Sequence, residues 1–189
     1  MNSIEEARQK LRTLYSKTSF EKMVQVTAIL TKLLEPYRIR PIIVGGLAVE
    51  IYTRSDYTTV DIDLIVSDRK RAGDLLVQLG FTPAGRHWYH EELMVSIEIP
   101  NDMLEDANYD KVIELRMKDG LKVYVIGIED IILDRLRACV HCKSTSDCEW
   151  GKRMFFLHAE RLDLEYMREM AKMDGTAVYL EEWVQQYNK

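Results

Sequence analysis

The chain has 189 residues, of which 47% are hydrophobic and 30% are charged, and its formal net charge at pH 7 is −5. This composition supplies a hydrophobic core for one domain, with or without a small appendage, and it excludes intrinsic disorder and argues against a broad nucleic-acid-coating surface. A membrane protein is excluded by the lack of an apolar run of roughly 18 residues, and the charged N-terminal residues lack a signal-peptide core, so a cytoplasmic protein is expected.

Two amphipathic helices are predicted at the start of the chain, between Met1 and Pro36, because apolar residues recur there at helical spacing. Pro36 ends the second helix. Arg38 and Arg40 then lead into an apolar strand at residues 42–44. The two arginines are interpreted either as contacts for a phosphate or a nucleic acid, or as solvated residues at the mouth of the strand.

A glycine pair, Gly45 and Gly46, follows this strand. Such a pair allows the backbone to turn sharply and to approach a phosphate with its N–H groups, although it is also found in ordinary turns. Leu47 to Tyr52 are predicted to form a short helix whose N-terminus faces the same phosphates. Arg54 follows in a polar loop as the nearest cation in sequence, either as a phosphate contact or as a surface residue.

The segment Val60 to Val66 predicts a buried strand that carries two aspartates, Asp61 and Asp63. Because side chains alternate along a strand, both carboxylates point to one face, with Cα atoms roughly 6 to 7 Å apart. Two buried carboxylates repel each other unless a proton or a divalent cation neutralises them. Asp-x-Asp on a rigid strand therefore predicts ligands for Mg²⁺, while a cap, a turn or a solvated edge stays the simpler alternative.

The next segments alternate between helix and strand. Residues 71–79 are predicted to form a helix, followed by strands at residues 81–89 and 93–99. In the last strand Glu98 lies on the polar face, because Val95, Ile97 and Ile99 alternate with it. Glu98 is the candidate third carboxylate of the site, and its alternative interpretation is a surface glutamate.

Taken together, Gly45-Gly46 and the later Thr59-Val60-Asp61-Ile62-Asp63-Leu64 resemble the signature of the DNA polymerase beta-like nucleotidyltransferase superfamily. The resemblance is to the small bacterial branch, with its toxin-type and antibiotic-modifying members. It implies that the glycines hold nucleotide phosphates, that Asp61 and Asp63 bind Mg²⁺ or Mn²⁺, and that Glu98 completes the metal site. Family members often have Asp at the third position, so the longer Glu98 departs from the pattern.

The rest of the chain predicts a hairpin and then helices. Two strands, at residues 112–117 and 121–126, flank an Asp-Gly turn. From Ile128 onward every long segment is helical, and residues 127–136 resemble the helix that follows the catalytic sheet in the same superfamily. The expected organisation is an α/β (α+β) catalytic core at residues 1–127, with a mixed sheet flanked by helices, and a helical region at residues 128–189. The helical tail could serve a protein partner or a homodimer.

Three cysteines lie in this helical region, at positions 139, 142 and 148. With His141 and His158 they could form a zinc site of the C-x2-C-x5-C type. No second paired cluster accompanies them, and free thiols are normal in a reducing cytosol, so three free cysteines are the favoured prediction.

The expected activity is a Mg²⁺-dependent transfer of a nucleoside monophosphate from an NTP, such as ATP, to an acceptor hydroxyl. Asp61, Asp63 and Glu98 are its catalytic and metal-binding candidates, and Gly45, Gly46 and Arg54 are its nucleotide-binding candidates. The acceptor stays open between an RNA end such as that of a tRNA, a protein and a small molecule. A glycosyltransferase is disfavoured because no nucleotide-binding half precedes the motif, and a calcium loop is excluded because Leu64 to Val66 offer no ligands. A non-catalytic nucleotide-binding or toxin–antitoxin protein on the same fold remains an alternative.

Overall fold

In the computed structural model, which describes residues 3–189, seven strands form one mixed sheet in the order β3-β4-β5-β2-β1-β7-β6. The strands are β1 (Ile42–Val44), β2 (Asp61–Ile65), β3 (Thr82–Ala84), β4 (His87–His90), β5 (Val95–Asn101), β6 (Ile113–Arg116) and β7 (Lys122–Val125). β1 runs antiparallel to β2 and parallel to β7, and β2 runs parallel to β5. The predicted α/β class with a mixed sheet is therefore confirmed.

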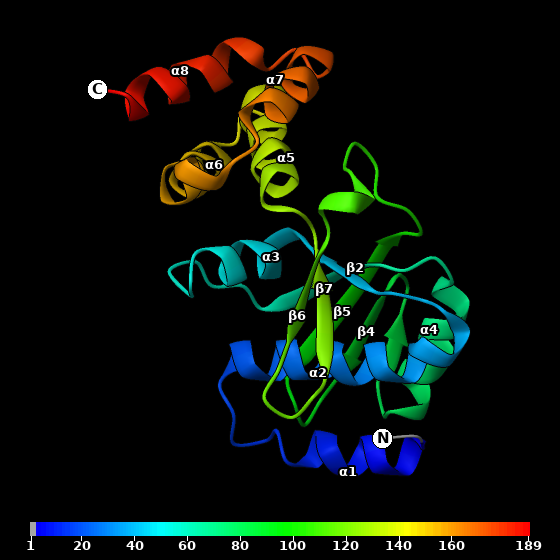
Figure 1. Ribbon diagram of the computed structural model, residues 1–189. Helices are drawn as coiled ribbons and strands as arrows, with labels where there is room; N and C mark the ends of the chain where they lie inside the picture. Colours follow the sequence, from blue (N-terminus) through cyan, green and yellow to red (C-terminus); the bar gives the residue numbers. More distant parts are fainter. Residues whose placement is uncertain (1–2) are drawn as a thin grey trace.

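Eight α-helices accompany this sheet within residues 3–189. They are α1 (Ile4–Arg12), α2 (Ser19–Leu34), α3 (Gly45–Tyr52), α4 (Arg69–Gln78), α5 (Ile128–His141), α6 (Thr145–His158), α7 (Leu164–Met173) and α8 (Ala177–Tyr187), with short 3-10 turns η1 (Glu35–Tyr37), η2 (Tyr109–Lys111) and η3 (Ala159–Arg161). Helix α2 lies across one face of the sheet with α1 beyond it, and α3 lies between the sheet and the C-terminal helices (Figure 1). Met1 and Asn2, the first residues of the predicted N-terminal helices, lie outside the described residues.

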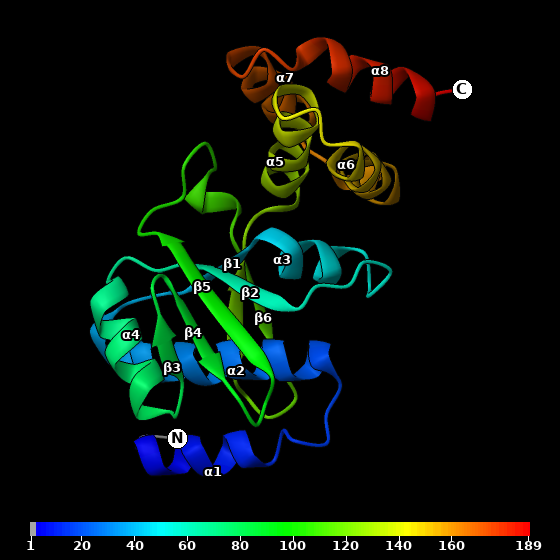
Figure 2. The ribbon, with the colours of Figure 1, turned by 180° about the vertical axis from the view of Figure 1, so that it is seen from behind.

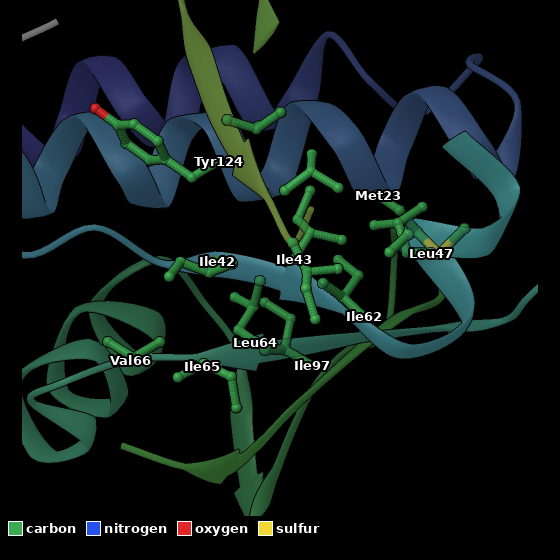
Figure 3. Close-up of a cluster of buried hydrophobic side chains, with 14 of the residues drawn as sticks. Met23, Ile42, Ile43, Leu47, Ile62, Leu64, Ile65, Val66, Ile97 and Tyr124 are labelled. Carbon is green, nitrogen blue, oxygen red and sulfur yellow. The ribbon is translucent and has the colours of Figure 1, made fainter. Parts of the chain in front are cut away.

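The main core lies between α2 and the sheet. Met23 of α2 packs near Leu47, Ile62 and Ile97, all of which are fully buried (Figure 3). Along β2 the buried Ile62 alternates with half-buried aspartates, so the apolar positions face this core and the acidic positions face the opposite side. The alternation that buries the strand therefore also presents the carboxylates of β2 on the other face.

The C-terminal helices α5 to α8 gather beyond the sheet, at the end opposite to α1 (Figures 1 and 2). A polar junction fixes α5 to the segment before β6. The buried Asp130 accepts hydrogen bonds from the Asn108 N–H, at 3.1 Å, and from the Tyr166 hydroxyl of α7, at 2.5 Å, while Lys111 pairs with Asp163 at 3.0 Å. None of the helices in residues 3–189 combines the length and the apolar character that crossing a membrane requires.

Three predicted elements differ from the structure. Helix α4 begins at Arg69 rather than at residue 71, and Asp68 caps it. Helix α3 begins at Gly45 rather than at Leu47, so the glycine pair forms its first turn. Residues 81–89 are a hairpin, β3 and β4, instead of one strand, because Gly85 adopts a φ of +66° and turns the chain.

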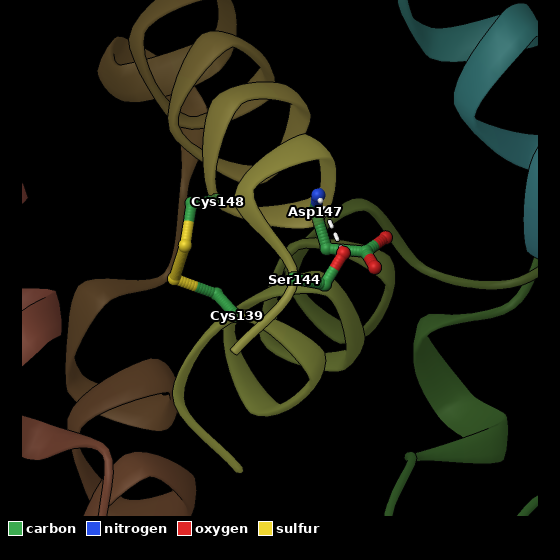
Figure 4. Close-up of a disulfide and its surroundings, with 4 residues drawn as sticks. All are labelled: Cys139, Ser144, Asp147 and Cys148. Carbon is green, nitrogen blue, oxygen red and sulfur yellow. Dashed lines mark hydrogen bonds between the residues drawn. A yellow bond between two sulfur atoms is a disulfide. The ribbon is translucent and has the colours of Figure 1, made fainter. Parts of the chain in front are cut away.

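The prediction of three free cysteines is wrong. Cys139 of α5 and Cys148 of α6 form a disulfide (Figure 4), and Cys142 alone is free and exposed. The pairing also removes two ligands of the alternative zinc site. Helices α5 and α6 form a hairpin with a short connection at residues 142–144, which brings the Cα atoms of Cys139 and Cys148 to 4.6 Å. Sequence spacing alone does not reveal this approach, because it depends on how the two helices pack.

Candidate active site

The sheet register brings the three predicted carboxylates to one face. In the parallel pair of β2 and β5, Asp63 lies opposite Glu98 and Asp61 lies opposite Ser96. All three acids are half-buried and lie on the face away from α2. Glu98 is thus the neighbour of Asp63 on the adjacent strand. The alternation of side chains predicted the polar face of each strand, but it did not predict that these two residues lie side by side.

The glycine pair lies directly against the aspartates. A Cβ atom on Gly45, whose φ is +58°, would lie 2.1 Å from Oδ2 of Asp63, so this position admits only glycine. The Gly46 N–H donates a hydrogen bond to the same carboxylate. A Cβ atom on Gly46 would lie 2.7 Å from Oγ1 of Thr59. The start of α3 and the Asp-x-Asp strand therefore form one packed unit.

Thr59 connects this unit to a buried acid that the sequence analysis missed. Its hydroxyl donates to Oδ1 of Asp61 at 2.9 Å, and its backbone N–H donates to Oε2 of Glu50 at 3.2 Å. Glu50 of α3 is only 3% exposed, and burial raises the pKa of its carboxyl. The isolated charge of Glu50 within the apolar run of residues 47–52 was the available signal. Thr59 lies in the loop before β2, from which it positions Asp61. The sequence does not predict this role, because the spacing of apolar residues gives no information on the conformation of a loop.

Asp63 carries the largest electrostatic perturbation among these carboxylates. Burial, followed by the charges of Asp61 and Glu98, raises its pKa from 3.8 to about 6. The Gly46 N–H and the guanidinium of Arg135 offset this only in part. An ionised Asp63 therefore lies in a site with an excess of negative charge, which a divalent cation would neutralise.

Glu98 has a partner within the protein. Its Oε1 lies 2.6 Å from Nε of Arg86, and its Oε2 lies 3.9 Å from Nδ1 of His87. Among residues 3–189, no three or more His, Cys, Asp and Glu side chains are gathered closely enough to hold a metal ion. The donor set nevertheless fits Mg²⁺ chemically, because three hard carboxylates share one face. Arg86 pairs with Oε1 of Glu98, and the second oxygen of that carboxylate, Oε2, is a candidate metal ligand.

A cavity of about 320 Å³ opens beside Asp63. Gly45 and Pro100 line it from the sheet side, and Ile131 and Asp134 line it from α5. Pro100 lies where the register of β5 shifts relative to β2, a bulge that lets the chain leave the sheet at the edge of the cavity. The first C-terminal helix thus forms one wall of the site.

Two arginines near the motif occupy different places. Arg54 follows the C-terminal end of α3, roughly 12 Å along the helix from the glycine pair, and its charge acts on His158. The structure therefore does not bring Arg54 together with the other predicted nucleotide-binding residues. Arg135 of α5, which the sequence did not single out, acts on Asp63 and is held by Asp147 at 2.7 Å. Its place depends on how α5 packs on the core.

Comparisons with known proteins bear on the family and the fold. Residues 21–189 match the model of the family described as nucleotidyltransferase of unknown function (DUF6036). No curated protein matches the chain. The solution structure of the antibiotic-resistance factor ANT(2'')-Ia is similar in fold, with a TM-score of 0.52 and 18% identity over 86% of this chain and 97% of that one. The crystal structure of an antigenic nucleotidyltransferase-like protein from Paracoccidioides brasiliensis has a TM-score of 0.58 and 14% identity over 90% and 93% of the two chains. Because the family model spans most of the sequence, this chain belongs to the DUF6036 family of nucleotidyltransferases of unknown function.

Proposed function

We propose that the protein is a Mg²⁺-dependent enzyme that transfers a nucleoside monophosphate from an NTP to an acceptor hydroxyl. The observation that carries the proposal is the close contact of Gly45 and Gly46 with the carboxylate of Asp63. Asp63 in turn lies opposite Glu98 on the neighbouring strand. A helix start beside clustered carboxylates combines backbone donors for a triphosphate with ligands for the metal that accompanies it.

In the proposed reaction the acceptor oxygen attacks the α-phosphorus of the NTP. A new O–P bond forms, the bond between the α-phosphorus and the bridging oxygen breaks, and pyrophosphate leaves with its electron pair. The acceptor hydroxyl loses its proton, for which Glu98 is the candidate base. Bound Mg²⁺ supplies charge neutralisation and a more acidic acceptor hydroxyl.

The residues of the chain have separate roles in this scheme. Asp61 and Asp63 would hold the metal, with Asp61 oriented by Thr59 and Asp63 by the Gly46 N–H. The backbone at Gly45 and Gly46 would meet the β and γ phosphates. Mn²⁺ has the same preference for carboxylate oxygen and is the alternative ion.

A non-catalytic nucleotide-binding protein on the same fold, including one half of a toxin–antitoxin pair, is the second candidate. The observation that favours it is the ion pair between Arg86 and Glu98, because this contact occupies the third carboxylate. Such a protein would bind an NTP with Mg²⁺ and release no pyrophosphate.

The test is pyrophosphate release from each of the four NTPs with Mg²⁺, in the presence of RNA, protein or small-molecule acceptors. Release that requires both the metal and one acceptor class supports the transferase. NTP binding in calorimetry without pyrophosphate release under any acceptor contradicts it and supports the second candidate. An Asp61→Asn variant is the control for contaminating enzymes.

A further inference from the structure

A second cavity, of about 580 Å³, lies on the same face of the sheet as the carboxylates. It is separate from the cavity beside Asp63, but Ile65 lines both cavities. Its size falls within the range of about 300 to 1,000 Å³ that is typical of small-molecule sites.

The strand register places this cavity next to the proposed catalytic site. Across the sheet, Ile65 pairs with Ile42 and Ile42 pairs with Tyr124, and these three side chains line the cavity as one row, which forms its floor. Asp63 and its partner Val44 form the adjacent row, two residues along the same strands. Adjacent rows on one face are roughly 6 to 7 Å apart. A ligand on the floor therefore needs to extend by only one row to reach the carboxylates.

One wall of the cavity is basic. Arg38 and Arg40 line it from the segment between α2 and β1, and both are exposed. Within residues 3–189 neither guanidinium has an ion-pair partner, although the Cζ atom of Arg40 lies 5.5 Å from the centre of the Tyr124 ring. Most arginines elsewhere in the described range, such as Arg137 and Arg168, are paired with carboxylates. Guanidinium groups that pair with no carboxylate are available to bind a phosphate.

Another wall is polar and acidic. Asp102 and Asp110 lie on the segment between β5 and β6, Glu114 lies on β6, and Ser67 follows β2. Glu114 pairs with Arg116 and Lys122, and within residues 3–189 none of the three acids pairs with Arg38 or Arg40. Tyr109 is 54% exposed on the acidic side and offers a ring face for stacking. This wall matches sugar hydroxyls or the exocyclic amine of a base, which donate hydrogen bonds.

We propose that this cavity binds the acceptor, and that the acceptor carries a phosphate on a nucleoside unit. Its phosphate lies on Arg38 and Arg40, its base or sugar lies toward Tyr109 and Asp110, and its free hydroxyl points along the shared Ile65 to Asp63. The proposal rests on the proposed function, because it names the class of acceptor for the same site. A free nucleotide and the end of an RNA strand share this chemistry. The cavity holds one such unit, which is compatible with the net acidic charge of the chain.

Binding without turnover tests the proposal separately from the transferase activity. Isothermal titration in the absence of NTP and Mg²⁺ uses three probes, namely a nucleoside 5′-monophosphate, an RNA tetranucleotide with a free 3′ hydroxyl, and the nucleoside without phosphate. The test variant is Arg38→Gln with Arg40→Gln. The matched control is Arg12→Gln with Lys118→Gln, which also removes two exposed positive charges but lies outside the cavity. Thermal unfolding checks that both variants fold. If the double test variant does not fold, the single variant Arg40→Gln is used in its place.

We expect wild type and the control variant to bind a phosphate-bearing probe with equal affinity, and the test variant to bind it at least tenfold more weakly. The nucleoside without phosphate should bind to wild type more weakly than the nucleotide does. Binding of the monophosphate identifies a free nucleotide as the source, whereas binding of the tetranucleotide alone identifies an RNA end. Equal binding by the test variant and wild type, or no binding of either phosphate-bearing probe by wild type, overturns the proposal. So does displacement of the probe by a non-hydrolysable NTP with Mg²⁺, which would assign the cavity to the donor. If the protein still binds NTP with Mg²⁺ when one of these outcomes is found, the proposal for the acceptor is wrong and the proposed nucleotide site is not contradicted.

Discussion

Replacing Asp63 by Asn should stabilise the metal-free protein while abolishing metal binding. Burial and the neighbouring charges of Asp61 and Glu98 raise the pKa of Asp63 to about 6, from an ordinary value of 3.8. A difference of this size corresponds to roughly 3 kcal/mol of unfavourable free energy for the ionised form. Because Asn has no charge and keeps an oxygen that accepts the Gly46 N–H bond, the variant should recover about 1 to 3 kcal/mol at pH 7.5.

The pH dependence of this difference gives the sign of the effect. Asp63 binds a proton more tightly in the folded than in the unfolded state, so its contribution to stability is fully present below pH 3.8 and is lost as the pH rises through about 6. Urea unfolding without divalent metal should show that the variant Asp63→Asn has a higher unfolding free energy than wild type. This gap should be small at pH 4.5 and large at pH 7.5. Added Mg²⁺ should stabilise only wild type. A gap that is independent of pH, or a variant that is less stable at pH 7.5, would refute the electrostatic reasoning.

Three further changes test individual contacts. Gly46→Val should push Thr59 away from the start of α3 and lower the unfolding free energy by about 1 to 3 kcal/mol. The free energy of NTP binding to the folded fraction should weaken by more than this loss of stability. A variant that binds NTP normally would limit Gly46 to a packing role. Glu98→Gln should retain NTP binding and lose roughly 10² to 10⁴ in single-turnover rate, and a wild-type rate would exclude Glu98 from the chemistry. Cys139→Ser should lower the unfolding free energy of oxidised protein by about 2 to 3 kcal/mol, measured in urea, whereas Cys142→Ser should leave it unchanged; equal effects of the two changes would contradict the disulfide.

Much of the fold could be predicted from the sequence because its patterns are local. Alternation along residues 60–66 and 93–99 placed Asp61, Asp63 and Glu98 on polar faces, and the Asp-Gly pair located the hairpin of β6 and β7. The start of α3 was displaced by two residues because a glycine pair has weak helical preference, and its position here is fixed by contacts with the aspartates.

The parts of the site that escaped prediction depend on tertiary contacts. The place of Arg135 beside Asp63 and the approach of the two disulfide cysteines both follow from the packing of α5, which no periodicity specifies. The same holds for Arg86, which reaches Glu98 only because β3 and β4 form a hairpin rather than one strand. Arg54 shows the converse, because its closeness in sequence to the motif did not bring it to the glycine pair, and its predicted phosphate contact stays a prediction.

The most direct test of the nucleotidyltransferase assignment compares NTP labelled at the α-phosphorus with NTP labelled at the γ-phosphorus. Each is incubated with Mg²⁺ and the acceptor classes named above. We expect that wild type attaches the α label covalently to an acceptor and releases the γ label in pyrophosphate, and that the Asp61→Asn variant does neither. Covalent attachment of the γ label, or bound NTP whose α label is never attached to any acceptor, would contradict the assignment.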